Sequence, residues 1–521
     1  MKSPAKSKKP LGARAFGASE KVEIASLPTG VGGLGEILGG GFPEFSFNLI
    51  AGMPGCGKTT LAHQIAFANA TNERPALYFT ILGEPVLKML RYQQQFSFFD
   101  LAKIGKAVRF VNLSDLALQS DLAVVFDAIV REVTAANAGI VILDSFQTLV
   151  RAATGDPAHG DVWDFVHRLN QFLTSSAATG FLIGEYTPME LGLSPVFTMV
   201  DGILWLTQET ERNSVVRKLQ VVKQRGQACI PGLHTVRIAK DGMQAFPRTL
   251  GLQRITTKPA DRRRLSLGVA ELDKMMGGGV LEGDSLLIAG PSGTGKSVLA
   301  TQFIAEGLRQ GDAGIMAIFE ERPGGYVQRA DAFGLCLAEA EAAGKLEVLY
   351  LRPLDLSVDE TMQAILDAIK RIGAKRLVID SLVGFEMALA PGFRTDFRES
   401  LYRMIGALTG AGVTILSTVE VEDNFTSLQF SRYAISFLTD DILRLRFVEI
   451  DGQLRKTMVI IKMRGGNHSK DFREYVITSD GVMIISPRRT DYGGLSTGIP
   501  LRTGPRLAQP DEAPPEPRAE K

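Results

Sequence analysis

Residues 52–59 read GMPGCGKT and residues 290–297 read GPSGTGKS, so the pattern G-x-x-x-x-G-K-[ST] occurs twice in the chain. Each copy lies between an apolar, strand-like run and a run with the apolar spacing of a helix. Glycines let the backbone amides of such a loop curl around phosphate groups, and the N-terminus of the following helix favours their negative charge. The pattern therefore predicts two phosphate-binding loops, each on a strand–loop–helix unit.

The two loops supply most of the residues that we expect to bind ATP with Mg²⁺. The lysine of this pattern reaches the β- and γ-phosphates, and the hydroxyl after it holds the metal ion, here at Thr59 and Ser297. The expected nucleotide-binding residues are Gly52, Gly55, Gly57, Lys58, Thr59 and Thr60 in the first loop, and Gly290, Gly293, Thr294, Gly295, Lys296 and Ser297 in the second.

The loops belong to a duplicated unit. A glycine triplet at residues 39–41 recurs at residues 277–279, and the landmarks after each triplet come in the same order. Strand-like runs alternate with helical ones in both halves, which predicts an α/β fold with one mostly parallel, twisted sheet per half, flanked by helices. We expect a disordered basic tail at residues 1–20, the first domain at 21–250, a linker at 251–264, the second domain at 265–487, and a disordered proline-rich tail at 488–521.

The composition narrows the class of protein. The chain has 521 residues with 58 Lys and Arg against 57 Asp and Glu, so its net charge offers no general attraction to nucleic acid or to an anionic membrane. Its three cysteines are far apart, and it contains neither a run of about 20 apolar residues nor the apolar core of a secretion signal. We therefore expect a cytoplasmic protein that binds neither nucleic acid nor a membrane.

An aspartate ends an apolar run in each half, since residues 140–144 read IVILD and residues 377–380 read LVID. A carboxylate at the end of a buried strand that faces a phosphate-binding loop can order Mg²⁺ and its water. Asp144 and Asp380 are therefore the expected carboxylate ligands of the two metal ions.

Glu320 and Glu321 follow another strand-like run of the second half, and such a pair can polarise a water or a hydroxyl for attack on the γ-phosphate. They are the candidate catalytic residues. In the first half, Leu82 and Gly83 stand at the corresponding places, with Glu84 next to them. The first site is therefore expected to bind ATP and to hydrolyse it slowly.

Late in each half, the sequence Lys-x-Arg-Gly occurs, at residues 223–226 and 462–465. Residues two apart on a strand project to the same face, so each segment presents two cations together. Lys223 with Arg225, and Lys462 with Arg464, can therefore reach phosphates. An ordinary solvated strand end is the alternative.

With these residues in hand, the chain resembles the KaiC family, the ATPases of the circadian clock, and the wider group of KaiC-like proteins in bacteria and archaea. The resemblance runs from about residue 23 to about residue 487. It rests on the doubled loop, the Phe-Glu-Glu at residues 319–321, the Lys-x-Arg-Gly of both halves, and the FVEI at residues 447–450. It implies two tandem RecA-like P-loop NTPase domains, a two-tiered homohexameric ring, and ATP held between subunits by the Lys-x-Arg cations of a neighbour.

The resemblance also implies that the second ring phosphorylates its own chain on an adjacent Ser-Thr pair. Aligned backward from the DDIL at residues 440–443, the serine of this pair falls on Ser436 and the threonine on Phe437, so one acceptor is kept and one is lost. The arginine that such proteins supply in trans is replaced by Met387, with Arg394 or Arg398 as substitutes. Residues 486–521 match no segment that recruits a stimulating partner.

One interpretation and two alternatives result. The interpretation is a KaiC-like ATPase and serine autokinase that signals through its hexameric state, with a small signalling or clock-like regulatory protein as its partner. The alternatives are a RecA-type DNA-repair or recombination ATPase, and a scaffold that uses ATP only to assemble. The near-zero net charge argues against DNA binding, and Glu320 with Glu321 argues against a pure scaffold.

Overall fold

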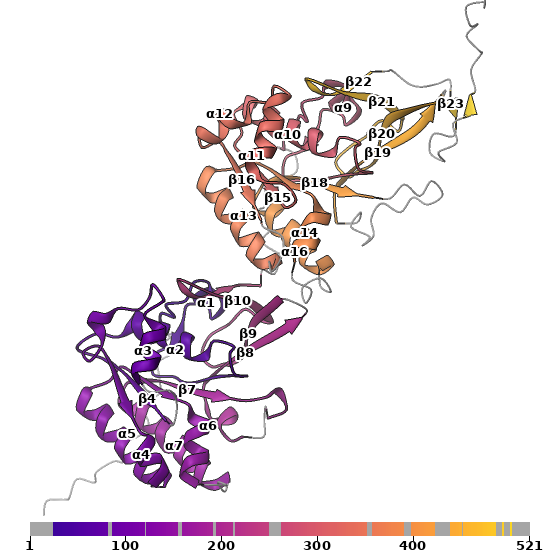
Figure 1. The fold of residues 1–521 in the computed structure, drawn as a ribbon. Coiled ribbons are helices and arrows are strands. Elements are labelled where there is room, and N and C mark those ends of the chain that lie inside the picture. Colours follow the sequence, from indigo (N-terminus) through magenta and orange to yellow (C-terminus); the bar gives the residue numbers. More distant parts are fainter. Residues whose placement is uncertain are drawn as a thin grey trace, which may run out of the picture. The chain divides into compact units, whose positions relative to one another are not determined.

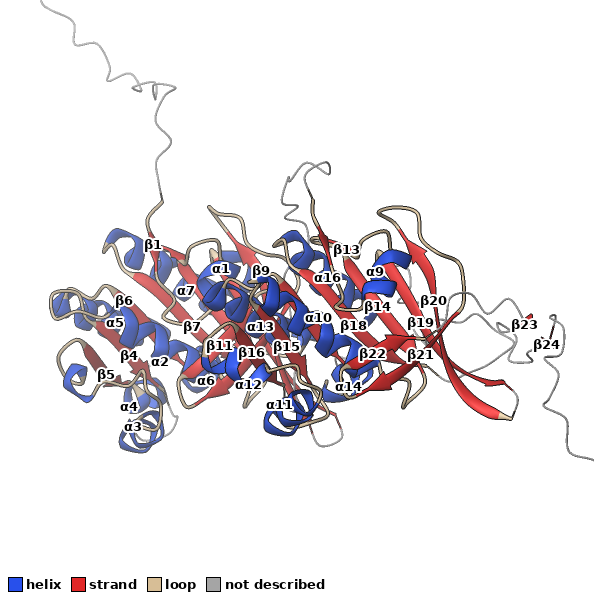
Figure 2. Ribbon diagram, turned by 90° about the horizontal axis from the view of Figure 1, so that it is seen from above, coloured by secondary structure: helices blue, strands red, loops and turns tan. Residues whose placement is uncertain are grey.

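A computed structural model describes residues 24–81, 86–119, 121–154, 159–190, 194–211, 214–248, 262–351, 357–389, 397–421, 438–450, 452–485, 492–493 and 501–502. The chain forms two compact units, and two large sheets with helices packed on them dominate the structure (Figures 1 and 2). Within these ranges, every helix is too short or too polar to cross a membrane.

The first sheet has nine strands in the order β11-β10-β9-β8-β3-β7-β6-β4-β5. Its strands are β3 (Phe47–Gly52), β4 (Ala76–Thr80), β5 (Val108–Asn112), β6 (Ile140–Asp144), β7 (Thr179–Glu185), β8 (Gly202–Glu211), β9 (Ser214–Gln224), β10 (Leu233–Ala239) and β11 (Gly242–Phe246). The strands from β8 to β5 in this order pair in parallel. Strands β3 and β4 are buried along their whole length, as expected for parallel strands that are covered on both faces.

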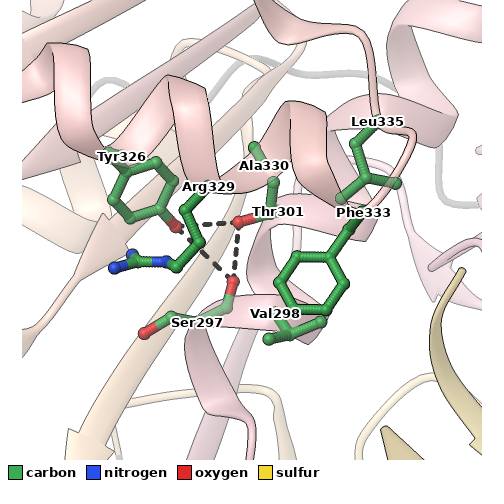
Figure 3. A pocket seen from close by; sticks show the side chains of 8 residues that line it. All are labelled: Ser297, Val298, Thr301, Tyr326, Arg329, Ala330, Phe333 and Leu335. Atoms are coloured by element: carbon green, nitrogen blue, oxygen red, sulfur yellow. Dashed lines mark hydrogen bonds between the residues drawn. The ribbon is translucent and has the colours of Figure 1, made fainter. Parts of the chain in front are cut away.

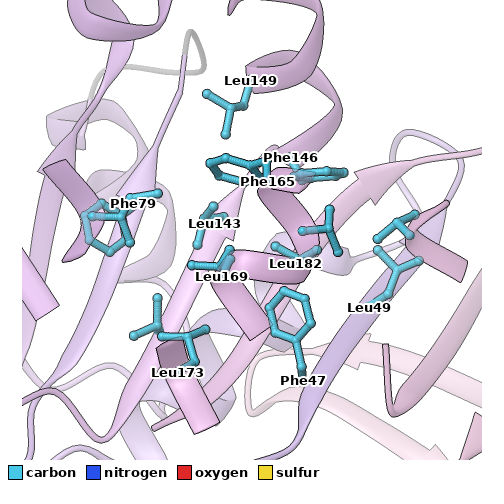
Figure 4. Close-up of a cluster of buried hydrophobic side chains, with 14 of the residues drawn as sticks. Phe47, Leu49, Phe79, Leu143, Phe146, Leu149, Phe165, Leu169, Leu173 and Leu182 are labelled. Carbon is cyan, nitrogen blue, oxygen red and sulfur yellow. The ribbon is translucent and has the colours of Figure 1, made fainter. Parts of the chain in front are cut away.

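Helices cover both faces of this sheet. They are α1 (Leu34–Ile37), α2 (Lys58–Asn69), α3 (Val86–Gln93), α4 (Ser114–Gln119), α5 (Leu122–Ala136), α6 (Phe146–Thr154), α7 (His159–Ser175) and α8 (Val196–Met199), with short 3-10 turns at Leu101–Lys103 and Pro188–Glu190. Side chains alternate along a strand, so Phe79 and Leu143 point to one face, where they pack with Phe165 and Leu169 of α7 (Figure 4). Tyr78 points to the other face, toward α2.

The second sheet has nine strands in the order β16-β15-β17-β18-β14-β19-β20-β21-β22. Its strands are β14 (Ser285–Gly290), β15 (Gly314–Ile318), β16 (Leu346–Tyr350), β17 (Arg376–Asp380), β18 (Thr414–Glu420), β19 (Asp441–Ile450), β20 (Gln453–Met463), β21 (Arg473–Thr478) and β22 (Gly481–Ile484). The strands from β16 to β19 pair in parallel, and β19 to β22 form an antiparallel extension.

The helices of the second half again flank the sheet. They are α9 (Ala270–Met275), α10 (Lys296–Gln310), α11 (Pro323–Ala332), α12 (Leu337–Ala342), α13 (Val358–Ile372), α14 (Leu382–Ala388) and α16 (Phe397–Gly410). One buried cluster includes Ile288 of β14 and Phe303 of α10, and a second includes Leu287 of β14 and Phe385 of α14. Successive residues of β14 thus enter the two separate cores on the two faces of the sheet.

The two sheets share one topology, because β5-β4-β6-β7-β3-β8-β9-β10-β11 corresponds strand by strand to β16-β15-β17-β18-β14-β19-β20-β21-β22. The predicted duplication and the predicted mostly parallel sheets are therefore confirmed. The domain limits stay predictions.

Short antiparallel strand pairs complete the fold: β1 (Ser26–Leu27) with β2 (Phe42–Pro43), β12 (Arg264–Leu265) with β13 (Val280–Leu281), and β23 (Tyr492–Gly493) with β24 (Leu501–Arg502). The last pair lies in a segment for which the composition predicts disorder.

Candidate nucleotide-binding sites

In each half, the phosphate-binding loop joins a buried central strand to a helix that begins at the lysine: β3 leads to α2, and β14 leads to α10. The glycine before that lysine has a left-handed backbone, with φ 103° at Gly57 and 94° at Gly295. A Cβ at Gly57 would lie 2.6 Å from Ile238 Cδ1, and a Cβ at Gly295 would lie 2.6 Å from Ile477 Cδ1. The left-handed backbone favours glycine at both positions, where the chain turns into the helix.

Both loop lysines fold over their own loop. Lys58 Nζ donates to the carbonyl oxygens of Gly52 and Met53 at 2.9 Å each, and Lys296 Nζ donates to that of Pro291 at 2.8 Å. Burial lowers the pKa of Lys296, and nearby carboxylates partly oppose this effect. The two ammonium groups thus lie within the two predicted phosphate-binding loops.

Two further hydroxyl residues of the expected set differ in their surroundings. Thr294 is buried, and its hydroxyl donates to the carbonyl oxygen of Pro291 at 2.8 Å. Its own carbonyl oxygen accepts a hydrogen bond from the hydroxyl of Tyr475 at 2.6 Å. Thr294 therefore stabilises the loop from inside, whereas Thr60 is half-buried in the first turn of α2.

Asp144 ends β6 beside the hydroxyl of the first loop. Thr59 Oγ1 donates to Asp144 Oδ2 at 2.9 Å, and the hydroxyl of Tyr78, on β4, donates to the same oxygen at 2.6 Å. Burial raises the pKa of Asp144, while the hydrogen bonds from Tyr78 and Thr59 and the charge of Lys58 oppose the rise. A hydroxyl beside a carboxylate matches the oxygen ligands that Mg²⁺ takes from proteins.

Asp380 ends β17 at the corresponding place in the second half. It accepts hydrogen bonds from Thr418 Oγ1 at 2.5 Å and from the hydroxyl of Tyr326, on α11, at 3.3 Å. The Tyr326 hydroxyl also lies 2.9 Å from Thr301 Oγ1. Both hydroxyls point toward the carbonyl oxygen of Ser297 in a small pocket between α10 and α11 (Figure 3). The second aspartate is thus held by hydroxyl donors, as the first one is.

The two expected Mg²⁺ sites need the phosphates of a nucleotide as additional ligands. In the described part of the chain, no group of three or more His, Cys, Asp or Glu side chains is arranged to hold a metal ion. Mg²⁺ is bound in nucleotide sites through one or two carboxylates, with phosphates and waters as its other ligands, and Thr59 with Asp144, or Ser297 with Asp380, fits that pattern.

The two adjacent glutamates of the second half face different partners. Glu320 Oε1 accepts a hydrogen bond from Ser381 Oγ at 2.7 Å, directly after Asp380. Glu321 instead forms a two-pronged ion pair with Arg329 of α11, at 2.6 and 2.8 Å. The structure therefore brings Glu320, and not Glu321, next to the strand-end aspartate. In the first half, β4 runs to Thr80, and Leu82, Gly83 and Glu84 lie outside the described residues.

The first Lys-x-Arg pair lies at the beginning of the parallel strands. Lys223 Nζ donates to the carbonyl oxygen of Thr198 at 2.9 Å, and Arg225 forms an ion pair with Asp201 at 3.3 Å. Asp201 also accepts a hydrogen bond at 3.0 Å from the backbone N–H of Phe47, the first residue of β3. Burial and the neighbouring arginine lower the pKa of Lys223.

The second pair repeats this arrangement. Lys462 Nζ donates to the carbonyl oxygen of Thr439 at 2.5 Å, Arg464 pairs with Asp440 at 3.4 Å, and Asp440 accepts a hydrogen bond from the backbone N–H of Ser285, the first residue of β14. The phosphate-binding loop follows the last residue of the same strand. A six-residue strand spans about 17–20 Å, so the cations and the loop of one domain lie at opposite edges of its sheet.

Ser436, the expected phosphate acceptor, and Phe437 lie outside the described residues, as does Arg394. Met387 is exposed on α14, and Arg398 is exposed on α16. Tyr78 and Tyr326, which contact the two aspartates, were not predicted from the sequence. Tyr78 lies in an apolar run and Tyr326 in a mixed segment, and only strand pairing or the path of α11 brings each of them to a carboxylate.

Two mostly parallel sheets define a protein with two tandem RecA-like ATPase domains, since each has a lysine folded into its phosphate-binding loop and an aspartate at the end of a neighbouring strand. Comparison with protein families makes the class specific. The chain belongs to the KaiC ATPase family. The model of this family, described as "ATPase: KaiC", matches residues 27–249 and 265–489.

Known relatives cover almost the whole chain. The circadian clock oscillator protein KaiC of Picosynechococcus sp. is 28% identical over 490 residues, which is 92% of this chain and 93% of the relative. The circadian clock oscillator protein KaiC 1 of Synechocystis sp. is 29% identical over 92% of both chains. That of Prochlorococcus marinus is 27% identical over 90% of this chain and 94% of its own. The predicted family is therefore confirmed, and with it an ATP-binding ATPase that contains two tandem domains.

Proposed function

We propose that each domain binds one Mg·ATP and that hydrolysis takes place mainly in the second domain. The observation that carries this proposal is the position of Glu320, whose carboxylate is held by Ser381 next to Asp380. The negative charge of Glu320 also raises the pKa of Lys296 in the loop, against the effect of burial. At the corresponding places in the first half the sequence has Leu82 and Gly83, whose side chains cannot accept a proton.

The residues of the second site divide the work between binding and proton transfer. Ser297 and Asp380 would hold Mg²⁺, as Thr59 and Asp144 would in the first site, and the ion would supply positive charge next to the phosphates. Lys296 binds the γ-phosphate. Glu320 takes the proton from the attacking water, and Ser381 keeps the Glu320 carboxylate in place.

The Lys-x-Arg cations serve the nucleotide of a neighbouring copy in this proposal. Lys223, Arg225, Lys462 and Arg464 lie at the sheet edge opposite the loop of their own domain, so their own nucleotide is out of reach. ATP held between two copies stabilises the assembly by mass action. A homohexamer is the assembly that the KaiC resemblance implies.

We further propose Ser436 as the acceptor of a phosphoryl group from ATP, and its support is the alignment on residues 440–443. In this step Ser436 Oγ bonds to the γ-phosphorus, the bond to the β–γ bridging oxygen breaks, ADP leaves, and the hydroxyl proton passes to Glu320 of the neighbouring copy. Phosphate at Ser436 would add about −1.5 to −2 charge and change the strength of the assembly.

Signalling through the assembly state is part of this proposal, with a small regulatory protein as the partner and the cytoplasm as the location. The relatives are named for the circadian clock, which supports a signalling role. We also keep 21–250 and 265–487 as the limits of the two domains, with 251–264 as the linker.

The decisive experiment incubates the purified protein with γ-labelled ATP and Mg²⁺. It measures phosphate release, maps phosphate by mass spectrometry, and sizes the assembly by light scattering. We expect turnover, phosphate on Ser436, and a ring of about six copies. Normal turnover with Ser436 unmodified would leave an ATPase without kinase activity, and an assembly without turnover would leave a scaffold. Salt-sensitive DNA binding would favour the recombination class.

A further inference from the structure

The hydroxyl of Tyr78 lies against the aspartate of the first site, and the mechanism above gives it no role. Tyr78 is fully buried in the middle of β4, and its hydroxyl donates to Asp144 Oδ2 at 2.6 Å. The same oxygen accepts the hydrogen bond of Thr59 Oγ1 at 2.9 Å. One carboxylate oxygen is thus bound by the loop hydroxyl on one side and by a phenol on the other.

Side chains from neighbouring elements pack against the ring of Tyr78. His63 of α2 stacks on its ring, with centroids 4.4 Å apart and an interplanar angle of 10°, and Phe110 of β5 packs against both rings. His63 Nδ1 also lies 2.8 Å from the carbonyl oxygen of Thr59. A carbonyl oxygen can only accept a hydrogen bond, so the Nδ1–H of His63 is the donor. Thr59, His63, Tyr78 and Asp144 therefore form a closed ring of contacts.

The second domain makes the same contact from a different element. Met316 stands at the place of Tyr78 in the strand register, because Tyr78 pairs with Ile142 two residues before Asp144, and Met316 has the same place before Asp380. The phenol comes instead from Tyr326 on α11, at the longer distance of 3.3 Å. The phenol thus reaches the first aspartate from within the sheet and the second from a helix, and the second aspartate is also held by Thr418 of β18.

A carboxylate that serves as a metal ligand must be held in the correct orientation. The hydroxyls of Thr59 and Tyr78 donate to the same oxygen of Asp144, so they hold this carboxylate in one orientation. We propose that Tyr78 is a positioning residue for Mg²⁺ in the first domain, holding Asp144 in the orientation in which it serves the metal ion. Tyr326 has the same role in the second domain, with a smaller effect because its bond is longer. The inference rests on the proposed binding of Mg·ATP at both sites.

The test isolates the first site by Lys296→Ala and adds Tyr78→Phe, which keeps the ring and removes only the hydroxyl. Two quantities are measured on the full chain: the Mg²⁺ concentration that half-saturates retention of a fluorescent ATP analogue, and Mn²⁺ binding by electron paramagnetic resonance. Partners of metal ligands contribute about 10–100-fold to metal affinity, so we expect the half-saturating Mg²⁺ concentration to rise about tenfold. The Mn²⁺ affinity should fall equally, while nucleotide binding in EDTA stays the same.

The matched control is Tyr326→Phe in a Lys58→Ala chain, where the rise should be smaller. Melting temperatures within a few degrees of the parent establish that both variants are folded. If nucleotide retention by the Lys296→Ala parent depends on Mg²⁺, and Tyr78→Phe changes the half-saturating Mg²⁺ concentration by less than twofold, the inference is wrong and the proposed function stands. A Lys296→Ala parent that retains nucleotide with no dependence on Mg²⁺ would overturn both.

Discussion

Replacing Glu320 with glutamine should nearly abolish ATP turnover in the second domain, whereas Glu321→Gln should have a much smaller effect. Glu320 lies beside Asp380 through its hydrogen bond with Ser381, where it can take a proton from the attacking water. Glutamine keeps the shape and the hydrogen bond but cannot act as the base. Loss of a general base lowers a rate by about 10²–10⁴-fold, which corresponds to about 3–5 kcal/mol in the activation barrier.

Glu321 has a different partner, and the expected loss is therefore much smaller. Its ion pair with Arg329 joins side chains that are 38% and 48% exposed. Exposed ion pairs contribute about 0.2–1 kcal/mol, so Glu321→Gln should change turnover by at most about fivefold. The difference between the two variants should be at least one order of magnitude.

The assay is phosphate release at saturating ATP and Mg²⁺ in a Lys58→Ala chain, so that only the second domain contributes. Ser381→Ala serves as an additional variant, since it should lower the rate by removing the hydroxyl that holds Glu320. If Glu321→Gln lowers the rate as far as Glu320→Gln does, the assignment of the base from this geometry is refuted. Unchanged turnover in Glu320→Gln would refute it as well.

Lys58→Ala and Lys296→Ala should each remove about half of the bound nucleotide, because each loop keeps its own lysine; labelled ATP counted per chain checks this, and full occupancy in either variant would contradict it. Arg464→Ala should weaken ATP-driven assembly, because this cation lies at the edge away from its own loop; light scattering measures the effect, and an unchanged ring would remove the trans role. Asp441→Asn should stabilise the protein by at most about 3 kcal/mol at pH 8 and by about half of that at pH 5, as urea unfolding at the two values would measure. Burial and the charge of Asp284 raise the pKa of Asp441 to about 6, so ionisation of Asp441 destabilises the fold above that pH. This destabilisation decreases as the pH falls toward 4. An equal effect of the substitution at both pH values would contradict this reasoning.

The sequence was sufficient wherever the determining physics is local. The left-handed backbone at Gly57 and Gly295 favours glycine for reasons confined to a few residues, and the motif therefore located both loops. The strand-end aspartates were also found, because a short apolar run that stops at a carboxylate is readable in the chain itself. Alternation of strands and helices was enough to predict two parallel sheets.

Contacts between residues far apart in the chain could not be predicted from the sequence. Tyr78 meets Asp144 only because β4 pairs with β6, and the two residues are 66 positions apart. Glu320 and Glu321 look equivalent as neighbours, and only the path of α11, which carries Arg329, separates their roles. The position of a Lys-x-Arg pair relative to its own loop likewise depends on the direction of the strands, which spacing alone does not give.

The location of the Lys-x-Arg cations and the phosphate-binding loop at opposite edges of each sheet gives every copy two unlike faces. Under the proposed trans arrangement, contacts of this kind run head to tail and close into a ring, whereas a twofold pair would bring like faces together. A Lys296→Ala copy and a Lys462→Ala copy would then damage opposite sides of a junction. Mixed in equal amounts, they would leave about a quarter of the second-domain junctions with an intact loop facing intact cations. Activity would thus return on mixing two inactive proteins, which a site contained within one copy cannot do.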